Sequence, residues 1–186
     1  MLISLHNLKL HKNLIEFNQE FPAGTLDLGS DARQTGPLQS EGRAMLVEEH
    51  DGHNGKLDDI RVVGGLKTDL EILCARCLEP VAFPVTRDFD LLYRPAGSDI
   101  AEDVEVELQD KDAAISYYER DGVELIDLLR EQVLLEVPLK TLCKEDCKGL
   151  CPQCGINLNT GKCECAQPPA DPRWEALKDL KDKLQK

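Results

Sequence analysis

Alternating apolar and polar positions run through most of the chain up to Glu119, which is the pattern of half-buried β-strands. We predict strands over residues 2–5, 14–21, 44–48, 60–63, 66–73 and 81–93, with further short strands at 104–108 and 115–119. The stretches 22–39 and 94–100 are rich in turn-forming residues and predict loops. Asp-Gly and Asn-Gly pairs between residues 49 and 55 predict a hairpin connection.

The period of the pattern changes after Arg120, where a broad helical face replaces the alternation. This face predicts a helix over about 123–136, with apolar positions at Leu125, Ile126, Leu128, Leu129, Val133 and Leu134. Asp121 and Glu124 have the spacing of a capping box, and Pro138 ends the helix. We expect this amphipathic helix to pack over one face of the sheet.

The cysteines give the clearest chemical signal. Cys74 and Cys77 form a C-x2-C at the turn between two predicted strands, so they belong at the tip of a hairpin. Six more follow the helix with the spacing C-x3-C-x3-C-x2-C-x8-C-x-C: Cys143, Cys147, Cys151, Cys154, Cys163 and Cys165. The pair Cys151 and Cys154 resembles a zinc knuckle, because Gly155 supplies a residue that takes positive φ after the second ligand.

We predict that all eight cysteines are metal ligands and that the metal is Zn²⁺, one or two ions per chain. Two groupings are open. Cys74, Cys77, Cys151 and Cys154 can form one site, leaving Cys143, Cys147, Cys163 and Cys165 for a second. Alternatively, one site is drawn from the six C-terminal cysteines and the hairpin pair stays free. An iron–sulfur cluster is less favoured because the flanking residues are polar.

Disulfides are the competing use of cysteine, and they require an oxidising compartment. The N-terminal residues lack a basic start followed by an apolar run, and no apolar run approaches the ~20 residues of a membrane span. We therefore expect a cytoplasmic protein without a membrane partner, in which metal binding is favoured over disulfides.

Together these elements predict an α+β fold: a mostly antiparallel β-sheet with one packed amphipathic helix and a C-terminal cysteine-rich zinc-binding segment ending in a short helix. We divide the chain into a sheet-and-helix core domain (1–139), a metal-binding segment (140–170) and a C-terminal helix (171–186). Asp171-Pro172 is typical of a helix start, and Trp174 is a candidate anchor for a partner.

Charge divides the chain more sharply than hydrophobicity does. The net charge is -13 overall, with -5 over residues 1–98, -10 over 99–139 and +2 over 140–186. An acidic middle region argues against broad binding to a phosphate backbone and favours a basic protein partner. Contact with RNA is expected only near the lysines of the cysteine segment.

Four groups of residues together resemble the YceD family, which is linked to accumulation of large-subunit ribosomal RNA. They are residues 74–79, the stretch from 123 to 139, the segment 146–159 with its Asp-Cys-Lys-Gly-Leu-Cys-Pro run, and Asp171-Pro172-Arg173-Trp174. The resemblance covers roughly residues 66–184. It implies a ribosome-assembly factor that supports 23S rRNA accumulation, with no established enzymatic activity.

We therefore expect a non-enzymatic factor in large-subunit biogenesis that binds a ribosomal protein or a pre-ribosomal particle and no small-molecule substrate. The sequence contains neither an H-E-x-x-H motif nor a G-x-S-x-G elbow. The alternative is a thiol-based redox enzyme or sensor that uses Cys74 and Cys77. Thiols that react slowly until the metal is removed would favour the structural interpretation.

Overall fold

The computed structural model describes residues 1–51, 55–98, 115–119 and 121–165. In these residues six strands form one sheet in the order β2-β4-β5-β6-β7, with β3 paired to β5 beyond the end of β4. Their bounds are β2 Leu14–Phe21, β3 Ala32–Gln34, β4 Leu38–Asp51, β5 Gly55–Leu73, β6 Pro80–Pro95 and β7 Ile115–Tyr118. Only β6 and β7 pair in parallel, so the predicted mostly antiparallel sheet is confirmed.

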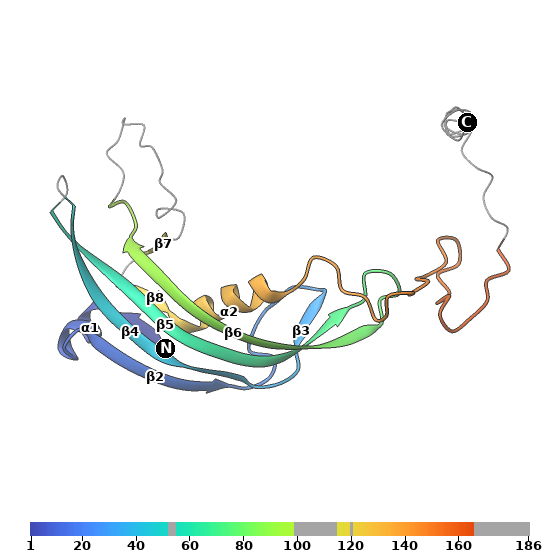
Figure 1. Ribbon diagram of the computed structural model, residues 1–186, viewed down its shortest axis with the longest axis horizontal. Coiled ribbons are helices and arrows are strands. Elements are labelled where there is room, and N and C mark those ends of the chain that lie inside the picture. The colour runs from blue at the N-terminus through green and yellow to red at the C-terminus, as the bar shows by residue number, and fades with distance from the viewer. Residues whose placement is uncertain (52–54, 99–114, 120, 166–186) are drawn as a thin grey trace, which may run out of the picture.

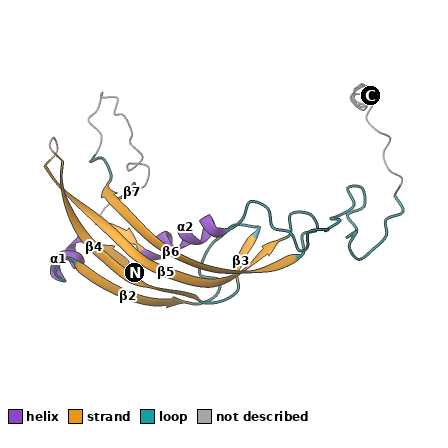
Figure 2. Ribbon diagram, in the orientation of Figure 1, coloured by secondary structure: helices purple, strands orange, loops and turns teal. Residues whose placement is uncertain are grey.

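The three central strands are long and strongly curved (Figures 1 and 2). β4 pairs with β5 from Gln39 to Asp51, and β5 pairs with β6 from Ile60 to Leu73. The β5–β6 hairpin therefore extends past the end of β4 and closes through residues 74–79. Its tip meets the cysteine-rich segment at one end of the sheet (Figure 1).

Strand positions agree with the sequence prediction better than strand lengths do. β2 has the predicted bounds. The strands predicted at 60–63 and 66–73 are one strand, because Gly64 and Gly65 pair with both neighbours without a break. β4 begins at Leu38, earlier than predicted, and β3 lies inside a stretch predicted as loop. The strand predicted at 104–108 lies outside the described residues.

Two glycines in the middle of the sheet make room for aromatic rings. Phe17, Gly42, Gly64 and Phe89 are neighbours in one row across four strands. A Cβ atom on Gly42 would lie 2.7 Å from Cζ of Phe17, and one on Gly64 would lie 3.1 Å from Cζ of Phe89. The rings therefore occupy the space above the glycines, and the missing side chains let the sheet curve.

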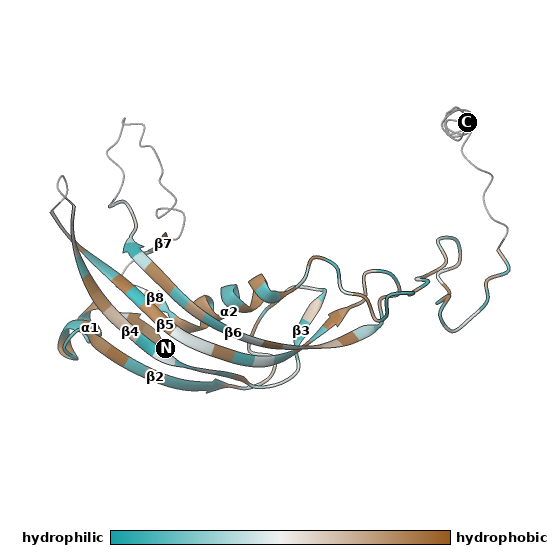
Figure 3. Cartoon of the chain, in the orientation of Figure 1, coloured by the Kyte–Doolittle hydropathy of each residue, from teal (hydrophilic) through white to brown (hydrophobic). Residues whose placement is uncertain are grey.

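One face of the sheet supplies most of the hydrophobic core. Alternate residues of β5 are buried there, namely Ile60, Val62, Leu66, Leu70 and Ile72. The same alternation is visible as changes of hydropathy along the strands (Figure 3). The helix α2, Leu125–Glu136, covers this face with Leu125, Leu128, Leu129 and Val133, as the sequence predicts.

The start of α2 differs from the predicted capping box. Residues 122–124 form a short strand, β8 (Gly122–Glu124), which pairs with β1 (Leu2–Ser4). Glu124 is the N-cap residue but makes no side-chain capping hydrogen bond. The amide of Leu125 instead donates to the carbonyl of Met1 at 2.9 Å. Tertiary pairing with the N-terminal strand thus takes the place of local capping.

Arg87 interrupts the apolar alternation of β6, and its contacts explain why. Its Nε donates to Oε1 of Gln132 at 3.0 Å, and its Nη1 forms an ion pair with Glu136. The arginine therefore links the middle of β6 to the last turns of α2.

A second, short helix, α1 (Leu5–Leu10), follows β1; it overlaps the last residue of the strand predicted at 2–5 and a stretch for which no element was predicted. Ser4 caps it by accepting a hydrogen bond from the amide of Asn7 at 3.2 Å. Within the described parts of the chain, no helix has both the length and the apolar character needed to cross a membrane. The helix predicted at 171–186 and its Trp174 lie outside these residues.

Candidate metal centre

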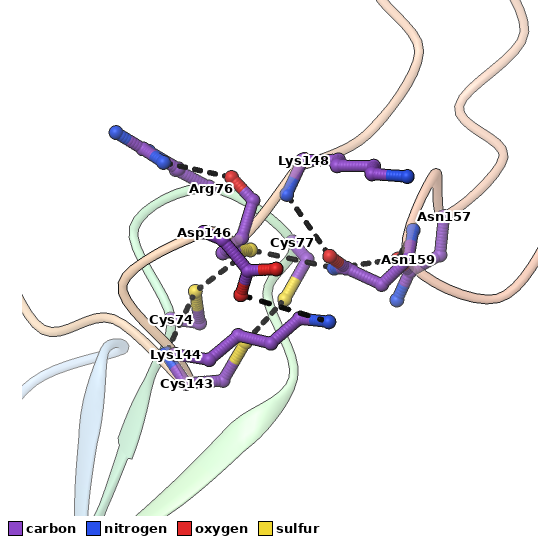
Figure 4. Close-up of polar contacts among 10 residues, drawn as sticks. Cys74, Arg76, Cys77, Cys143, Lys144, Asp146, Lys148, Asn157 and Asn159 are labelled. Atoms are coloured by element: carbon purple, nitrogen blue, oxygen red, sulfur yellow. Dashed lines mark hydrogen bonds and ion pairs between the residues drawn. The ribbon is translucent and has the colours of Figure 1, made fainter.

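All eight cysteines are free thiols that gather into two clusters of four. We call Cys74, Cys77, Cys143 and Cys147 the hairpin cluster, and Cys151, Cys154, Cys163 and Cys165 the terminal cluster. Within each cluster every sulfur lies within 4.8 Å of the others. The hairpin cluster joins the tip of the β5–β6 hairpin to the chain that returns from α2 (Figure 4).

The hairpin cluster forms because backbone contacts bring these two segments together. The amide of Ala75 donates to the carbonyl of Thr141 at 2.8 Å, and the amide of Cys143 donates to Sγ of Cys74 at 3.4 Å. Three of the four cysteines are buried, and Cys74 is 0% exposed. Val81, Leu142 and Leu150 pack against them and form a small core of their own.

The C-x2-C pairs of the two clusters share one backbone construction. In each, the amide of the first cysteine donates to the carbonyl five residues further along, at 2.9 Å in both cases. The residue after the second cysteine has positive φ, 60° at Leu78 and 73° at Gly155. Its amide donates to the carbonyl of the first cysteine, at 3.0 Å in one knuckle and 2.9 Å in the other. Both turns are therefore zinc knuckles in shape.

The sulfur separations fit a tetrahedral ion. A Zn–S distance of about 2.3 Å implies sulfur pairs about 3.8 Å apart. In the hairpin cluster Cys74 and Cys147 lie 3.8 Å apart, and Cys77 and Cys143 lie 3.5 Å apart. In the terminal cluster Sγ of Cys163 lies 3.6 Å from that of Cys154 and 3.2 Å from that of Cys151. Four thiols in this arrangement suit Zn²⁺, and the hairpin cluster has the closer match.

Backbone amides prepare the first cysteine of each knuckle to act as a thiolate. The N–H groups of Arg76 and Cys77 lower the pKa of Cys74 to about 6, and those of Cys154 and Gln153 do the same for Cys151. The side-chain amide of Asn159 is the first cause of a lowered pKa at Cys147.

Other thiols in the clusters retain their protons more strongly. Desolvation raises the pKa of Cys143 to about 12, and the hydrogen bond with Cys163 is the main cause that raises the pKa of Cys165 to about 12. Each cluster thus combines thiols that ionise easily with thiols that hold protons, and an ion that binds must displace those protons.

One cationic side chain lies beside the hairpin cluster. Figure 4 shows Lys144 running along its sulfurs, whereas the charged ends of Arg76 and Lys148 point away from them. Lys144 also pairs with Asp146 at 3.9 Å. Because an ion held by four thiolates carries net negative charge, Lys144 lowers the free-energy cost of forming it.

Asparagine side chains connect the terminal cluster to the hairpin cluster. Nδ2 of Asn159 donates to Sγ of Cys147 at 3.3 Å, while its Oδ1 accepts from the amide of Lys148 at 2.9 Å. Nδ2 of Asn157 donates to Oε1 of Glu79 at 3.1 Å. The loop that supplies ligands to one cluster therefore also orients a ligand of the other.

A second set of contacts centres on Arg76. Its Nη1 donates to the carbonyl of Cys147 at 2.7 Å, and its own carbonyl accepts from the amide of Leu150 at 3.1 Å. Gly149 has a φ of 77°, and a Cβ atom there would lie 3.0 Å from the Arg76 carbonyl oxygen. Only glycine fits this close approach without strain.

The structure overturns both groupings considered from the sequence. Cys74 and Cys77 do not join Cys151 and Cys154, and they are not left as a free pair. The physical reason is chain order: the segment after α2 reaches the hairpin tip at Thr141, so the next two cysteines fill the places beside the first knuckle. The later four cysteines lie further along and gather by themselves.

Several residues that shape the clusters escaped the sequence reasoning. Asn157, Asn159 and Arg76 act through hydrogen bonds that no spacing reveals. Leu78 carries the positive φ that Gly155 signals in the second knuckle, but a leucine gives no such signal. The glycine at position 149 was the one detectable clue, since it stands between two cysteines.

Comparison with known proteins agrees with the sequence resemblance. The model of the family described as large ribosomal RNA subunit accumulation protein YceD matches residues 62–181. A chloroplastic Arabidopsis thaliana protein named large ribosomal RNA subunit accumulation protein YCED homolog 1 is 27% identical over 150 residues, which are 70% of this chain and 47% of that protein. No solved structure matches the chain.

Two bacterial relatives carry no functional name. The uncharacterized Bacillus subtilis protein YlbN is 26% identical over 174 residues, which are 92% of this chain and 91% of that protein. An uncharacterized Mycobacterium tuberculosis protein, Rv2926c, is 33% identical over 107 residues, which are 58% of this chain and 48% of that protein. The chain thus spans about half the length of the plant and mycobacterial relatives.

Proposed function

The chain belongs to the YceD family, and from this premise we propose that it is a non-enzymatic factor in large ribosomal subunit biogenesis that supports accumulation of 23S rRNA. Two zinc ions, one in each cysteine cluster, hold its C-terminal segment in shape. The family match over residues 62–181 carries the ribosomal part of this proposal, and the two clusters carry the zinc part.

The character of the clusters supports a structural use of the metal. Four cysteines per cluster leave no open coordination position for a substrate, unlike a catalytic zinc with three protein ligands. The redox alternative needs an accessible thiolate, whereas Cys74 and Cys77 are both buried and each has a sulfur contact in the returning segment. These features support a metal scaffold over a thiol enzyme.

The class of partner that we propose is based on the distribution of charge along the chain. The net charge of -10 over residues 99–139 favours a basic ribosomal protein, free or within a pre-ribosomal particle. Contact with rRNA is local to residues 140–186, where Lys140, Lys144, Lys148, Lys162 and Arg173 lie. So few cations give weak binding with a shallow salt dependence.

A depletion experiment tests the ribosomal role. Removing the protein from its host should lower the ratio of large-subunit to small-subunit rRNA, and the wild-type chain should restore it. A Cys74→Ser variant, which loses the hairpin cluster, should restore it poorly. An unchanged rRNA ratio on depletion would contradict the proposal.

A further inference from the structure

The two cysteine clusters differ in how easily an oxidant reaches them. The terminal cluster lies beyond the tip of the β5–β6 hairpin, away from the sheet (Figure 1). Cys154 is exposed and Cys163 is half-buried, and their sulfurs lie 3.6 Å apart. A thiol that is oxidised to a disulfide needs access to the oxidant and a second thiol close by. This pair has both.

Backbone contacts hold Cys154 in place and leave Cys163 free to approach it. Cys154 belongs to the second knuckle, in which the amide of Gly155 donates to the carbonyl of Cys151 at 2.9 Å. Residues 161–165 belong to no helix or strand, and within the described chain the backbone of 162–165 forms no backbone–backbone hydrogen bond. A disulfide holds its sulfurs about 2.05 Å apart, so the two sulfurs must approach by roughly 1.5 Å. Little in the backbone opposes this movement.

The hairpin cluster contains a comparable pair of sulfurs, but the fold restrains both. Cys143 is exposed, and its sulfur lies 3.5 Å from that of Cys77, which is only 4% exposed. The amide of Cys143 donates to Sγ of Cys74 at 3.4 Å, and the amide of Leu78, next to Cys77, donates to the carbonyl of Cys74 at 3.0 Å. Sulfur spacing is therefore similar in the two clusters, whereas exposure and backbone restraint differ.

We propose that the terminal cluster is a site of reversible oxidation by a hydroperoxide, in which Cys154 reacts first and then forms a disulfide with Cys163. This inference rests on the proposed function, because it concerns the ligands of the second zinc ion. It differs from a redox centre built on Cys74 and Cys77, which remain structural ligands.

The reaction moves two electrons from the two cysteine sulfurs to the peroxide. The thiolate of Cys154 attacks one oxygen of hydrogen peroxide, the O–O bond breaks and hydroxide leaves, which gives a sulfenic acid. The thiolate of Cys163 then attacks the sulfenic sulfur, and a second hydroxide leaves as the S–S bond forms. Only Cys151 and Cys165 remain as ligands, too few for a closed tetrahedral zinc site.

The consequences of this oxidation are local and reversible. The hydrophobic core of the sheet contains none of the terminal cysteines, so its packing does not depend on their oxidation state. A dithiol reverses the reaction by thiol–disulfide exchange, in which the dithiol becomes a disulfide and both cysteines become thiols again. Oxidation thus changes the order of the terminal loops and leaves the rest of the fold intact.

The test treats the full-length, zinc-loaded protein, purified under reducing conditions, with hydrogen peroxide. A chromophoric indicator measures released zinc, and alkylated samples are digested with trypsin and mapped by mass spectrometry. Trypsin places the four cysteines of the hairpin cluster on separate peptides, and it separates the first two cysteines of the terminal cluster from the last two. Fragmentation of the linked peptides then distinguishes Cys154 from Cys151.

Peroxide should release one of the two ions and link Cys154 to Cys163, while the hairpin thiols stay reduced and retain the other ion. Addition of a dithiol and Zn²⁺ should restore the second ion. Cys163→His keeps four ligands, since Cys₃His sites are common for structural zinc, but removes the thiol that completes the disulfide. This variant should lose the terminal ion several times more slowly than the wild-type protein. Cys143→His, the matched change in the hairpin cluster, should lose it at the wild-type rate.

Three results would overturn the proposal: release of the hairpin ion first or of both ions together, a disulfide that does not include Cys154, or release from Cys163→His at the wild-type rate. The zinc content before peroxide is added tests the proposed function separately. Fewer than two ions would contradict the two-zinc scaffold, whereas two ions that both resist peroxide would contradict only the oxidation of the terminal cluster.

Discussion

The two cysteine clusters have the same kind of knuckle but different surroundings. The hairpin cluster is mostly buried, grows from two long strands and is covered by its own small apolar core. In the terminal cluster only Cys151 is buried, and loops supply all four ligands. The two clusters therefore have the same set of four cysteine ligands, but the rest of the fold supports the hairpin cluster far more than the terminal cluster.

This difference teaches that coordination alone does not determine how firmly an ion is held. Burial limits the access of water and chelators to the hairpin cluster, and the sheet holds two of its ligands in place without the metal. The terminal cluster must order its loops as it binds, which lowers its net affinity. We therefore expect a firmly held ion in the hairpin cluster and a more exchangeable one in the terminal cluster.

Removing one ligand cysteine, from either the hairpin cluster or the terminal cluster, should give the largest effect on metal content and order. Cys74→Ser should abolish the first ion and also loosen the terminal cluster, because without that ion the segment that carries Cys147 and Lys148, the partners of Asn159, loses its attachment to the hairpin. Cys163→Ser should remove only the terminal ion. Structural zinc contributes about 10–16 kcal/mol in zinc-finger peptides, so the loss of order should be large. Hydrogen exchange should show fast exchange from residue 140 onward in Cys74→Ser.

The same exchange experiment provides its control, since Cys163→Ser should keep protection at the amides of Ala75 and Cys147, which donate to the carbonyls of Thr141 and Lys144. Protection in the β-sheet and α2 should persist in both variants, because the core cluster contains no ligand cysteine. Equal loss of protection in the two variants would show that the clusters form one cooperative unit and not two unequal ones.

Asn159 should give the next largest effect. Asn159→Leu removes the hydrogen bond to Sγ of Cys147, and loss of such a partner typically costs 10–100-fold in metal affinity. Competition with a chromophoric chelator measures this affinity. Thr160→Ala, at a neighbouring exposed position, should leave it unchanged. If Asn159→Leu and Thr160→Ala change the metal affinity equally, the contact from Asn159 does not orient Cys147 as a ligand.

The residues after the two knuckles should give the smallest effect. Gly155→Leu places a side chain in the left-handed region at a cost of about 1–2 kcal/mol. Leu78→Gly relieves the same strain, offset in part by the greater freedom of glycine in the unfolded chain. The melting temperature of the metal-loaded protein should fall for Gly155→Leu and stay level or rise for Leu78→Gly. A fall in both would show that Leu78 contributes through packing.

Local patterns were enough to predict the sheet, α2 and the knuckle at the hairpin tip. Alternation identified β2 and most of β5 and β6, and the change of period identified α2. The cap of α2 was wrong because its first amide bonds to Met1, a contact between distant parts of the chain. Likewise, Gly64 and Gly65 suggest a break in isolation, yet pairing on both sides keeps β5 continuous.

The candidate site was predictable in its members but not in its grouping. Spacing nominates eight cysteines, and it cannot say which of them meet, because that depends on where the chain returns from α2.

Native mass spectrometry during slow chelation tests the central claim most directly. The untagged, full-length protein should carry two zinc ions per chain. Chelator should remove them in two steps, through a long-lived species with one ion that Cys163→Ser mimics and Cys74→Ser does not. Less than half an equivalent of any metal, or masses lowered by the hydrogen atoms lost to disulfides, would contradict the account.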